Sequence, residues 1–531
     1  MKKRLTASLK KLQNSKPAKT PETKLEKLQA WFLARKLDVI IVGILLLISG
    51  LVSGLNMTGY PQRFEDEGTY VSQAWAVQNK HTLAHYTYWY DHPPVGWIQI
   101  AGYTTLTGAF QRYGSAITAG REFMLVIHLA TIVLMYALAR RLKIGMIATS
   151  VGVLAYALSP LVIEFSRYVL LDNIAIPWLL GAFFLALSPR RNLAAAIGSA
   201  FCMAIAILSK ETVAVLLPVL IYAMWRNSDK RNRRYMFTTF GVVFVMVSGF
   251  YLLYAAIKNE LFPGSGHVSL FGTLIWQLSG REGSGSIFDA NSGTRGLVKL
   301  WLDLDPWLIA AGTLALPFTL VKRNLRVVSL ALLTGLVLLL RTGYLPFPYI
   351  VALLPFAALT FAGALHYLVV VPLSQKQQRL LGYAAKTGAA ALAVVIIAFT
   401  LLTVLPQWQP KISAATSNDQ DQSSRQAVDW VDQNVGRENR LVVESALWTD
   451  LQGKGFSEPE PVWLYKTETD PEVTKEIGGW QGIDYIVLNG PTISNNSPET
   501  FPTVYTAIKH SEIVAQFGQD QQKIVIYKVN H

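Results

Sequence analysis

Residues 39–59 read VIIVGILLLISGLVSGLNMTG, an apolar run without a charged side chain. A helix needs about 20 apolar residues to cross the roughly 30 Å hydrocarbon core of a bilayer. The basic segment before this run is much longer than the basic region of a signal peptide. The run therefore predicts a retained first membrane span that follows a basic cytoplasmic tail, residues 1–36.

Ten more hydrophobic stretches follow, so the sequence predicts a polytopic α-helical membrane protein with about 11 transmembrane helices. Two connections between them are long, at 60–120 and 258–304, and both hold acidic residues. The stretches near 212 and 327 are short between charged residues. The ten stretches lie at roughly 121–139, 144–161, 172–188, 192–209, 212–225, 235–257, 305–321, 327–342, 348–371 and 384–405.

The net charge of +14 divides unevenly along the chain. Residues 1–405 hold 38 Lys and Arg against 17 Asp and Glu, a net charge of +21, whereas residues 406–531 hold 10 against 17, a net charge of −7. Nucleic-acid binding requires basic residues clustered on one solvated domain. Here the basic residues lie between hydrophobic stretches, so no nucleic-acid partner is expected.

Basic residues mark every second connection between the predicted spans. Because cytoplasmic loops are enriched in Lys and Arg, this pattern places the N-terminus in the cytoplasm and residues 406–531 on the extracytoplasmic side of the plasma membrane. Asp229 is the only acidic residue in these loops. The basic residues are Arg140, Arg141, Lys143, Arg190, Arg191, Arg226, Lys230, Arg231, Arg233, Arg234, Lys322, Arg323, Arg326, Lys376 and Arg379.

Residues 406–531 are predicted to form an extracytoplasmic α/β domain. An amphipathic helix is expected at 424–435 and strands at 440–443, 485–488 and 523–529. The domain has no phosphate-binding glycine fingerprint and no nucleophile motif. Cys202 is the only cysteine of the chain, which excludes intramolecular disulfides and thiolate metal centres.

Carboxylates gather in the first outer connection, where Glu65-Asp66-Glu67 and Asp91-His92-Pro93-Pro94 follow the first span. A solvated loop is the plain interpretation of such a triplet. The alternative is a general base held close to the membrane surface.

Two cations lie at the outer ends of other spans, Arg167 within Ser-Arg-Tyr-Val-Leu-Leu-Asp-Asn and Lys210 before Glu211. Either one alone is typical of a basic side chain that extends toward the interface. Together with the carboxylates, they suit a reaction in which a carboxylate takes a proton while cations stabilise a departing phosphate.

These elements, in this order, resemble polyprenyl-phosphate-dependent glycosyltransferases of the GT-C fold. The likeness is to the superfamily of protein O-mannosyltransferases and lipid A aminoarabinose transferases, of the glycosyltransferase family 39 type, and it covers most of residues 37–405. It implies a GT-C transmembrane catalytic domain. It also implies transfer of a hexose or pentose from a polyprenyl-phosphate donor in the membrane lipid to an acceptor hydroxyl, with inversion. The acceptor would be a glycan, a lipid or a protein.

The resemblance also implies roles for single residues. Asp66 would be the general base, with Glu67 beside it supporting position or charge. Arg167 and Lys210 would bind the donor phosphate, and Asp172 would orient Arg167.

The resemblance implies roles for further residues because of their positions along the sequence. His92 stands where the aminoarabinose transferases have a phosphate-contacting lysine, and Glu211 would support this group. Arg341, at the outer end of a short span, is a second candidate for phosphate or sugar contact. Asp91 and His267 correspond to ligands of a divalent metal ion in those enzymes, although a solvated loop histidine is the alternative for His267.

Two functions of other classes remain as alternatives. A transporter or flippase for a lipid-linked or anionic substrate would place charges near the bilayer midplane and show duplicated halves. The charges here collect at the outer mouths, and the two halves show no repeat. The other alternative is a membrane-anchored receptor whose C-terminal domain binds a glycan.

Overall fold

The computed structural model describes residues 35–374, 380–495 and 497–531. The chain divides into two compact units, Met1–Ile44 and Leu45–His531. In the first unit, the described residues begin helix α3 (Lys36–Gly54). Almost all of the predicted basic tail, and also Lys376 and Arg379, lie outside the described residues. The elements that carry the site belong to the second unit.

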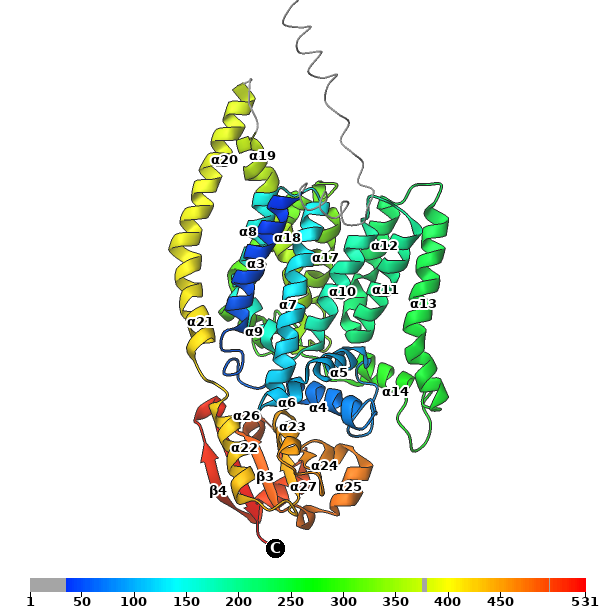
Figure 1. The fold of residues 1–531 in the computed structure, drawn as a ribbon, viewed down its shortest axis with the longest axis vertical. Coiled ribbons are helices and arrows are strands. Elements are labelled where there is room, and N and C mark those ends of the chain that lie inside the picture. Colours follow the sequence, from blue (N-terminus) through cyan, green and yellow to red (C-terminus); the bar gives the residue numbers. More distant parts are fainter. Residues whose placement is uncertain (1–34, 375–379, 496) are drawn as a thin grey trace, which may run out of the picture. The chain divides into compact units, whose positions relative to one another are not determined.

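Helices dominate the chain up to residue 417 (Figure 1). The segments 65–112 and 270–304, in the two long connections between predicted spans, are also helical for much of their length. The helices after α3 are α4 (Glu65–Asn79), α5 (Val95–Thr107), α6 (Ala109–Arg112), α7 (Ala116–Arg141), α8 (Met146–Leu158), α9 (Pro160–Arg167), α10 (Leu171–Ala186), α11 (Leu193–Ser209), η1 (Glu211–Leu216), α12 (Leu217–Asn227), α13 (Arg233–Ile257), α14 (Leu270–Ile275), η2 (Trp276–Gly280), α15 (Gly293–Leu304), α16 (Pro306–Val321), α17 (Arg326–Leu338), η3 (Phe347–Ala352), α18 (Leu354–Leu365), η4 (His366–Val370), α19 (Val371–Ser374), α20 (Leu380–Phe399), η5 (Thr400–Val404) and α21 (Leu405–Ser417).

The apolar helices identify a multi-pass membrane protein. Within the described part of the chain, 5 helical stretches are long and apolar enough to cross a membrane, or up to 7 if each of two bent pairs is one span. The bent pairs are α8 with α9, at 61°, and α15 with α16, at 103°. The helices α10, α11 and α17 are apolar but shorter. Each predicted stretch overlaps a helix, but the count of eleven spans stays a prediction.

Residues 418–531 build a five-stranded mixed sheet with the strand order β2-β1-β3-β5-β4. Strand β1 pairs in parallel with β2 and β3, while β5 pairs antiparallel with β3 and β4. Strands β1, β3 and β5 coincide with the predicted strands to within a residue. The elements are α22 (Gln422–Asn434), β1 (Leu441–Val443), α23 (Ser445–Gly453), β2 (Val462–Trp463), α24 (Lys466–Thr469), α25 (Pro471–Ile477), η6 (Trp480–Gly482), β3 (Tyr485–Asn489), α26 (Gly490–Asn495), α27 (Pro502–Lys509), β4 (Ser511–Phe517), η7 (Asp520–Gln522) and β5 (Ile524–Val529).

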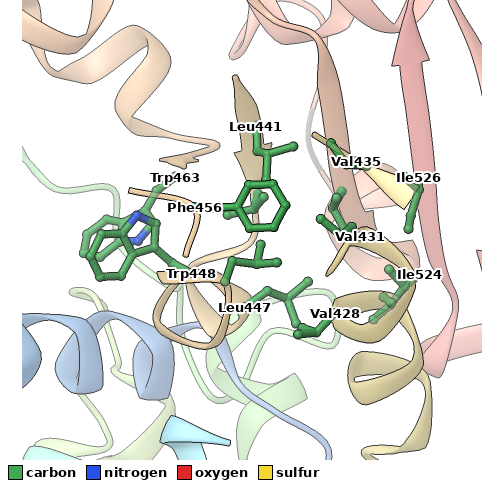
Figure 2. Close-up of a cluster of buried hydrophobic side chains, with 14 residues drawn as sticks. Val428, Val431, Val435, Leu441, Leu447, Trp448, Phe456, Trp463, Ile524 and Ile526 are labelled. Carbon is green, nitrogen blue, oxygen red and sulfur yellow. The ribbon is translucent and has the colours of Figure 1, made fainter. Parts of the chain in front are cut away.

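Both faces of this sheet are buried because successive side chains of a strand point to opposite faces. Leu441 and Val443 of β1 pack into one hydrophobic cluster with α22 and α23, and Val442 packs into a second cluster with α25 and α27. Figure 2 shows the first cluster, in which Val431 of α22 lies near Ile526 of β5. The sheet therefore has helices on both sides.

Helix α4 is fixed to the C-terminal residues by direct contact. A Cβ added at Gly68 would lie 2.2 Å from the backbone nitrogen of Ala446 in α23, so only glycine allows this approach. Just before α4, the buried Arg63 pairs with Asp421 at 2.7 Å, Nε to Oδ1, and with Asp450 at 2.6 Å, Nη1 to Oδ2. The start of α4 is thus held by residues about 360 to 390 positions further along the chain.

Candidate functional site

The first turn of α4 contains the three consecutive carboxylates, and Glu67 is the one that fixes the helix in place. Its Oε2 accepts a hydrogen bond from the backbone nitrogen of Phe64 at 3.0 Å, which satisfies a free N–H group at the start of the helix. Its two oxygens also accept hydrogen bonds from the Arg121 guanidinium at 2.9 and 2.8 Å, and Oε1 accepts one from the Val169 nitrogen at 3.0 Å. Both charged groups are buried. Since its lone pairs are occupied, we assign Glu67 as a positioning residue rather than the predicted catalytic one.

The carboxylate of Asp66, one residue earlier, differs from that of Glu67 in its hydrogen bonds. It is half-buried, and no hydrogen bond or ion pair reaches its carboxylate from another described residue. The charged groups that act on it are Lys210, His92, Arg281 and Asp91. Desolvation raises the pKa of Asp66 and outweighs the lowering by the cations. A carboxylate with free lone pairs and a raised pKa is suited to accept a proton.

Lys210, His92 and Glu211 form a hydrogen-bonded chain. Lys210 Nζ lies 3.2 Å from His92 Nε2, and His92 Nδ1 lies 3.1 Å from both carboxylate oxygens of Glu211. Desolvation would raise the pKa of Glu211, but His92 and Lys210 lower it to about 2. This series of hydrogen bonds joins three of the predicted site residues and holds in place the Lys210 charge that acts on Asp66.

Asp172 also belongs to this group, but its partner differs from the predicted one. Its Oδ2 lies 3.8 Å from Lys210 Nζ, and both side chains are buried. Desolvation would lower the pKa of Lys210, whereas the Asp172 and Glu211 carboxylates raise it. Asp172 therefore supports the charge of Lys210 instead of orienting Arg167.

Arg167 is buried, and its guanidinium donates hydrogen bonds to backbone carbonyl oxygens. Its Nη1 and Nη2 donate to four carbonyl oxygens at 2.7 to 3.2 Å, those of Tyr60, Ala415, Val52 and Leu55. Val52 lies in α3, Leu55 and Tyr60 lie in the segment after α3, and Ala415 lies in α21. Arg167 ties these segments together, so the structure does not favour the predicted phosphate contact.

Arg281, in the second long connection between predicted spans, is among the charged groups that act on Asp66. It is half-buried, and its guanidinium lies 3.4 Å from the ring centroid of Tyr344. The predicted Arg341 is exposed and donates to the Tyr344 carbonyl at 2.7 Å. Gly and Ser surround Arg281 in the sequence, and no motif marks it as a site residue.

A cavity of about 590 Å³ adjoins this charged group. Thr69 and Gln73 line it, and they follow Asp66 at positions i+3 and i+7 of α4, on the same helix face. The remaining wall comes from the first outer connection, the segment after α13 and the C-terminal residues, namely Ala84, Tyr86, Thr87, Trp89, Asp91, Pro263, Gly264, His267, Val268, Ser269, Gly272, Thr273, Trp276, Trp463, Tyr465, Lys466 and Thr469.

Comparisons with known proteins agree with this architecture. Residues 91–253 match the family described as dolichyl-phosphate-mannose-protein mannosyltransferase, and no curated protein matches the chain. Solved structures of the same fold include ArnT from Cupriavidus metallidurans bound to undecaprenyl phosphate, with TM-score 0.57 and 16% identity over 93% of this chain and 98% of that chain. They also include the archaeal oligosaccharyltransferase AglB from Archaeoglobus fulgidus in complex with an inhibitory peptide and a dolichol-phosphate, with TM-score 0.54 and 12% identity over 87% and 70%.

The chain therefore shares the fold of these solved glycosyltransferases, and residues 91–253 match a mannosyltransferase family model. One GT-C structure, of the Archaeoglobus fulgidus oligosaccharyltransferase, is a complex with Zn and sulfate. Here Asp91 and His267 line one cavity, but His267 is exposed and its Nδ1 lies 2.9 Å from the Val268 carbonyl oxygen. The described residues contain no group of three or more His, Cys, Asp or Glu that could hold a metal ion. The assignment of Asp91 and His267 as metal ligands stays a prediction, and no metal enters the function proposed below.

Two C-terminal residues reach the site that the sequence analysis did not identify, namely Tyr465 and Lys466. Tyr465 Oη lies 3.5 Å from Thr69 Oγ1, one turn after Asp66. Lys466 is buried, and Asp91 is among the charges that act on it. No local motif marks either residue, so a sequence signal for them is lacking.

Proposed function

We propose that the protein transfers a sugar from a polyprenyl-phosphate-linked donor to an acceptor hydroxyl, with inversion and with Asp66 as the general base. The observation that carries the proposal is the Asp66 carboxylate, which bonds to no described residue and feels the positive charges of Lys210 and Arg281. The lipid phosphates bound to ArnT and AglB support a donor of this class.

The mechanism follows from where the charges lie. The acceptor oxygen attacks the anomeric carbon while its proton passes to Asp66, and the bond from that carbon to the phosphate oxygen breaks. Polyprenyl phosphate leaves with both bonding electrons. Lys210 and Arg281 stabilise the charge that develops on this phosphate, in the way that preorganised donors stabilise an oxyanion. Glu211 and Asp172 keep Lys210 charged and in position.

The site is proposed to face the extracytoplasmic side. Every second connection between the hydrophobic stretches is basic, and α4 and the 65–112 segment belong to the other set of connections. The donor sugar and the residues that bind it would therefore lie at the outer membrane surface, and the C-terminal sheet would lie on the same side.

The test is transfer by the full-length protein in lipid nanodiscs, with undecaprenyl phosphate carrying radiolabelled mannose, glucose or arabinose as donor. Asp66→Asn should lower the transfer rate by about 10²- to 10⁴-fold, the contribution of a general base. Its melting temperature should not change, because no described residue bonds to this carboxylate. Glu65→Gln, in the same helical turn, is the matched control and should stay active. Full activity of Asp66→Asn would falsify the assignment of the base.

A further inference from the structure

The cavity beside Asp66 has a largely aromatic wall. The rings come from three separate parts of the chain and belong to Tyr86, Trp89, Trp276, Trp463 and Tyr465. Tyr86 and Trp463 lie 4.6 Å apart, centroid to centroid, and Trp463 and Tyr465 lie 5.6 Å apart. Aromatic rings offer large, rigid apolar faces. Such faces stack against the C–H faces of sugar rings.

Polar atoms without partners occur on the same wall. Gln73 Oε1, Trp89 Nε1 and Trp463 Nε1 are buried and have no hydrogen-bond partner among the described residues. A buried polar group left in this state costs about 1–3 kcal/mol. The tryptophan nitrogens can only donate and the glutamine oxygen can only accept. A ligand with several hydroxyl groups could satisfy both kinds after small rotations of these side chains, whereas a lipid tail could satisfy neither.

Lys466 adds a charged donor to this wall. Its Nζ lies 5.6 Å from the ring centroid of Tyr86, 5.2 Å from that of Trp89 and 5.9 Å from that of Tyr465. Asp470 is its carboxylate partner, with Oδ2 3.7 Å from Nζ. Desolvation lowers the pKa of Lys466 to about 8. A cation held between ring faces is placed to donate to hydroxyl oxygens of a ligand that stacks on those rings.

We propose that this cavity is the acceptor subsite and that it binds a sugar residue, so that the acceptor is a glycan. The inference rests on the proposed function and names the class of its second substrate. The α4 face that carries Asp66 continues into the cavity through Thr69 and Gln73, so a sugar bound there would lie along the same helix face as the proposed base. Lys210 and Arg281 do not line the cavity and remain for the donor phosphate. The C-terminal residues 463–469 thereby select the acceptor.

Binding of the acceptor can be measured without any turnover. The full-length protein in nanodiscs is titrated with linear tetrasaccharides of mannose, galactose, glucose or arabinose, and binding is followed by saturation-transfer NMR. The variants are Lys466→Met and Trp276→Ala. Trp276 is half-exposed, so its replacement leaves the buried core intact. The control is Trp480→Ala, whose ring stacks on His510 outside the cavity. A thermal melt confirms that each variant is folded.

The wild type should bind at least one tetrasaccharide, and each cavity variant should weaken that binding by about ten- to a hundredfold, while the control does not. Undecaprenyl phosphate, titrated in parallel, should bind equally well to all four proteins. If the glycosyl transfer itself is absent, saccharide binding still reports on the subsite. The proposal is overturned if no tetrasaccharide binds, if both cavity variants bind like the wild type, or if a peptide panel binds in their place with the same sensitivity to Lys466→Met.

Discussion

Lys210 at the end of α11 and Asp172 at the start of α10 form a buried ion pair, with 3.8 Å between Nζ and Oδ2. This pair holds the cation that acts on Asp66. Four carbonyl oxygens hold Arg167 instead, so the two cations that look alike in the sequence have different tasks. Substitution of each should therefore affect a different measurement.

Replacement of Lys210 should impair use of the donor. We expect Lys210→Met to lower kcat/KM for the polyprenyl-phosphate sugar by about 10²-fold, by analogy with loss of one oxyanion donor. Lys210→Arg should recover part of the loss because it keeps the charge beside Asp172. The measurement is initial transfer rate against donor concentration. Unchanged donor kinetics in Lys210→Met would remove the phosphate role.

Replacement of Arg167 should affect stability instead. Arg167→Met leaves four carbonyl oxygens without this donor, and a buried unpaired polar group costs about 1–3 kcal/mol. The melting temperature should fall, and the kcat/KM for donor of the folded protein should stay near that of the wild type. Arg112→Met is the control because Arg112 is largely exposed and pairs with Glu122 at the surface. A lowered kcat/KM for the donor with an unchanged melting temperature would instead support the predicted role of Arg167 in binding the donor phosphate.

Gly68 should not tolerate even a methyl group. Gly68→Ala would place Cβ 2.2 Å from backbone atoms of α23, so the helices must separate. We expect a lower melting temperature together with lower transfer activity, because α4 carries Asp66. Gly102→Ala in α5 is the matched control, since nothing lies within 4 Å of its added Cβ. Equal behaviour of the two variants in a thermal melt would contradict the close packing.

Glu444 should make stability depend on pH. It is buried, and desolvation together with the Glu65 carboxylate raises its pKa from 4.5 to about 8. The folded state thus binds the proton more tightly than the unfolded state, so the stabilisation is complete below about pH 4.5 and is lost as pH rises through about 8. In Glu444→Gln the melting temperature should fall less between pH 5 and pH 9 than in the wild type. The exposed Glu438→Gln should keep the wild-type slope, and an equal slope in both variants would refute this role of Glu444.

The sequence predicted those features that depend on local pattern. Hydrophobic length marked the helices, alternation marked strands β1, β3 and β5, and charge at the span ends marked Asp66 and Lys210. It did not separate Arg167 from Arg281, because which cation faces the site depends on where backbone carbonyls lie after folding. Nor did it reveal Lys466, which is 400 positions from Asp66 and has no motif of its own.

The contact between Gly68 and Ala446 also limits how the protein can open. Two helices whose backbones touch cannot slide or tilt independently, so α4 and α23 move as one rigid body. A bulky lipid-linked sugar then cannot enter by swinging the C-terminal residues away from the base. The entrance for the proposed donor would then form among segments that do not touch α23, because a displacement of the C-terminal residues would carry Asp66, the proposed base, with it.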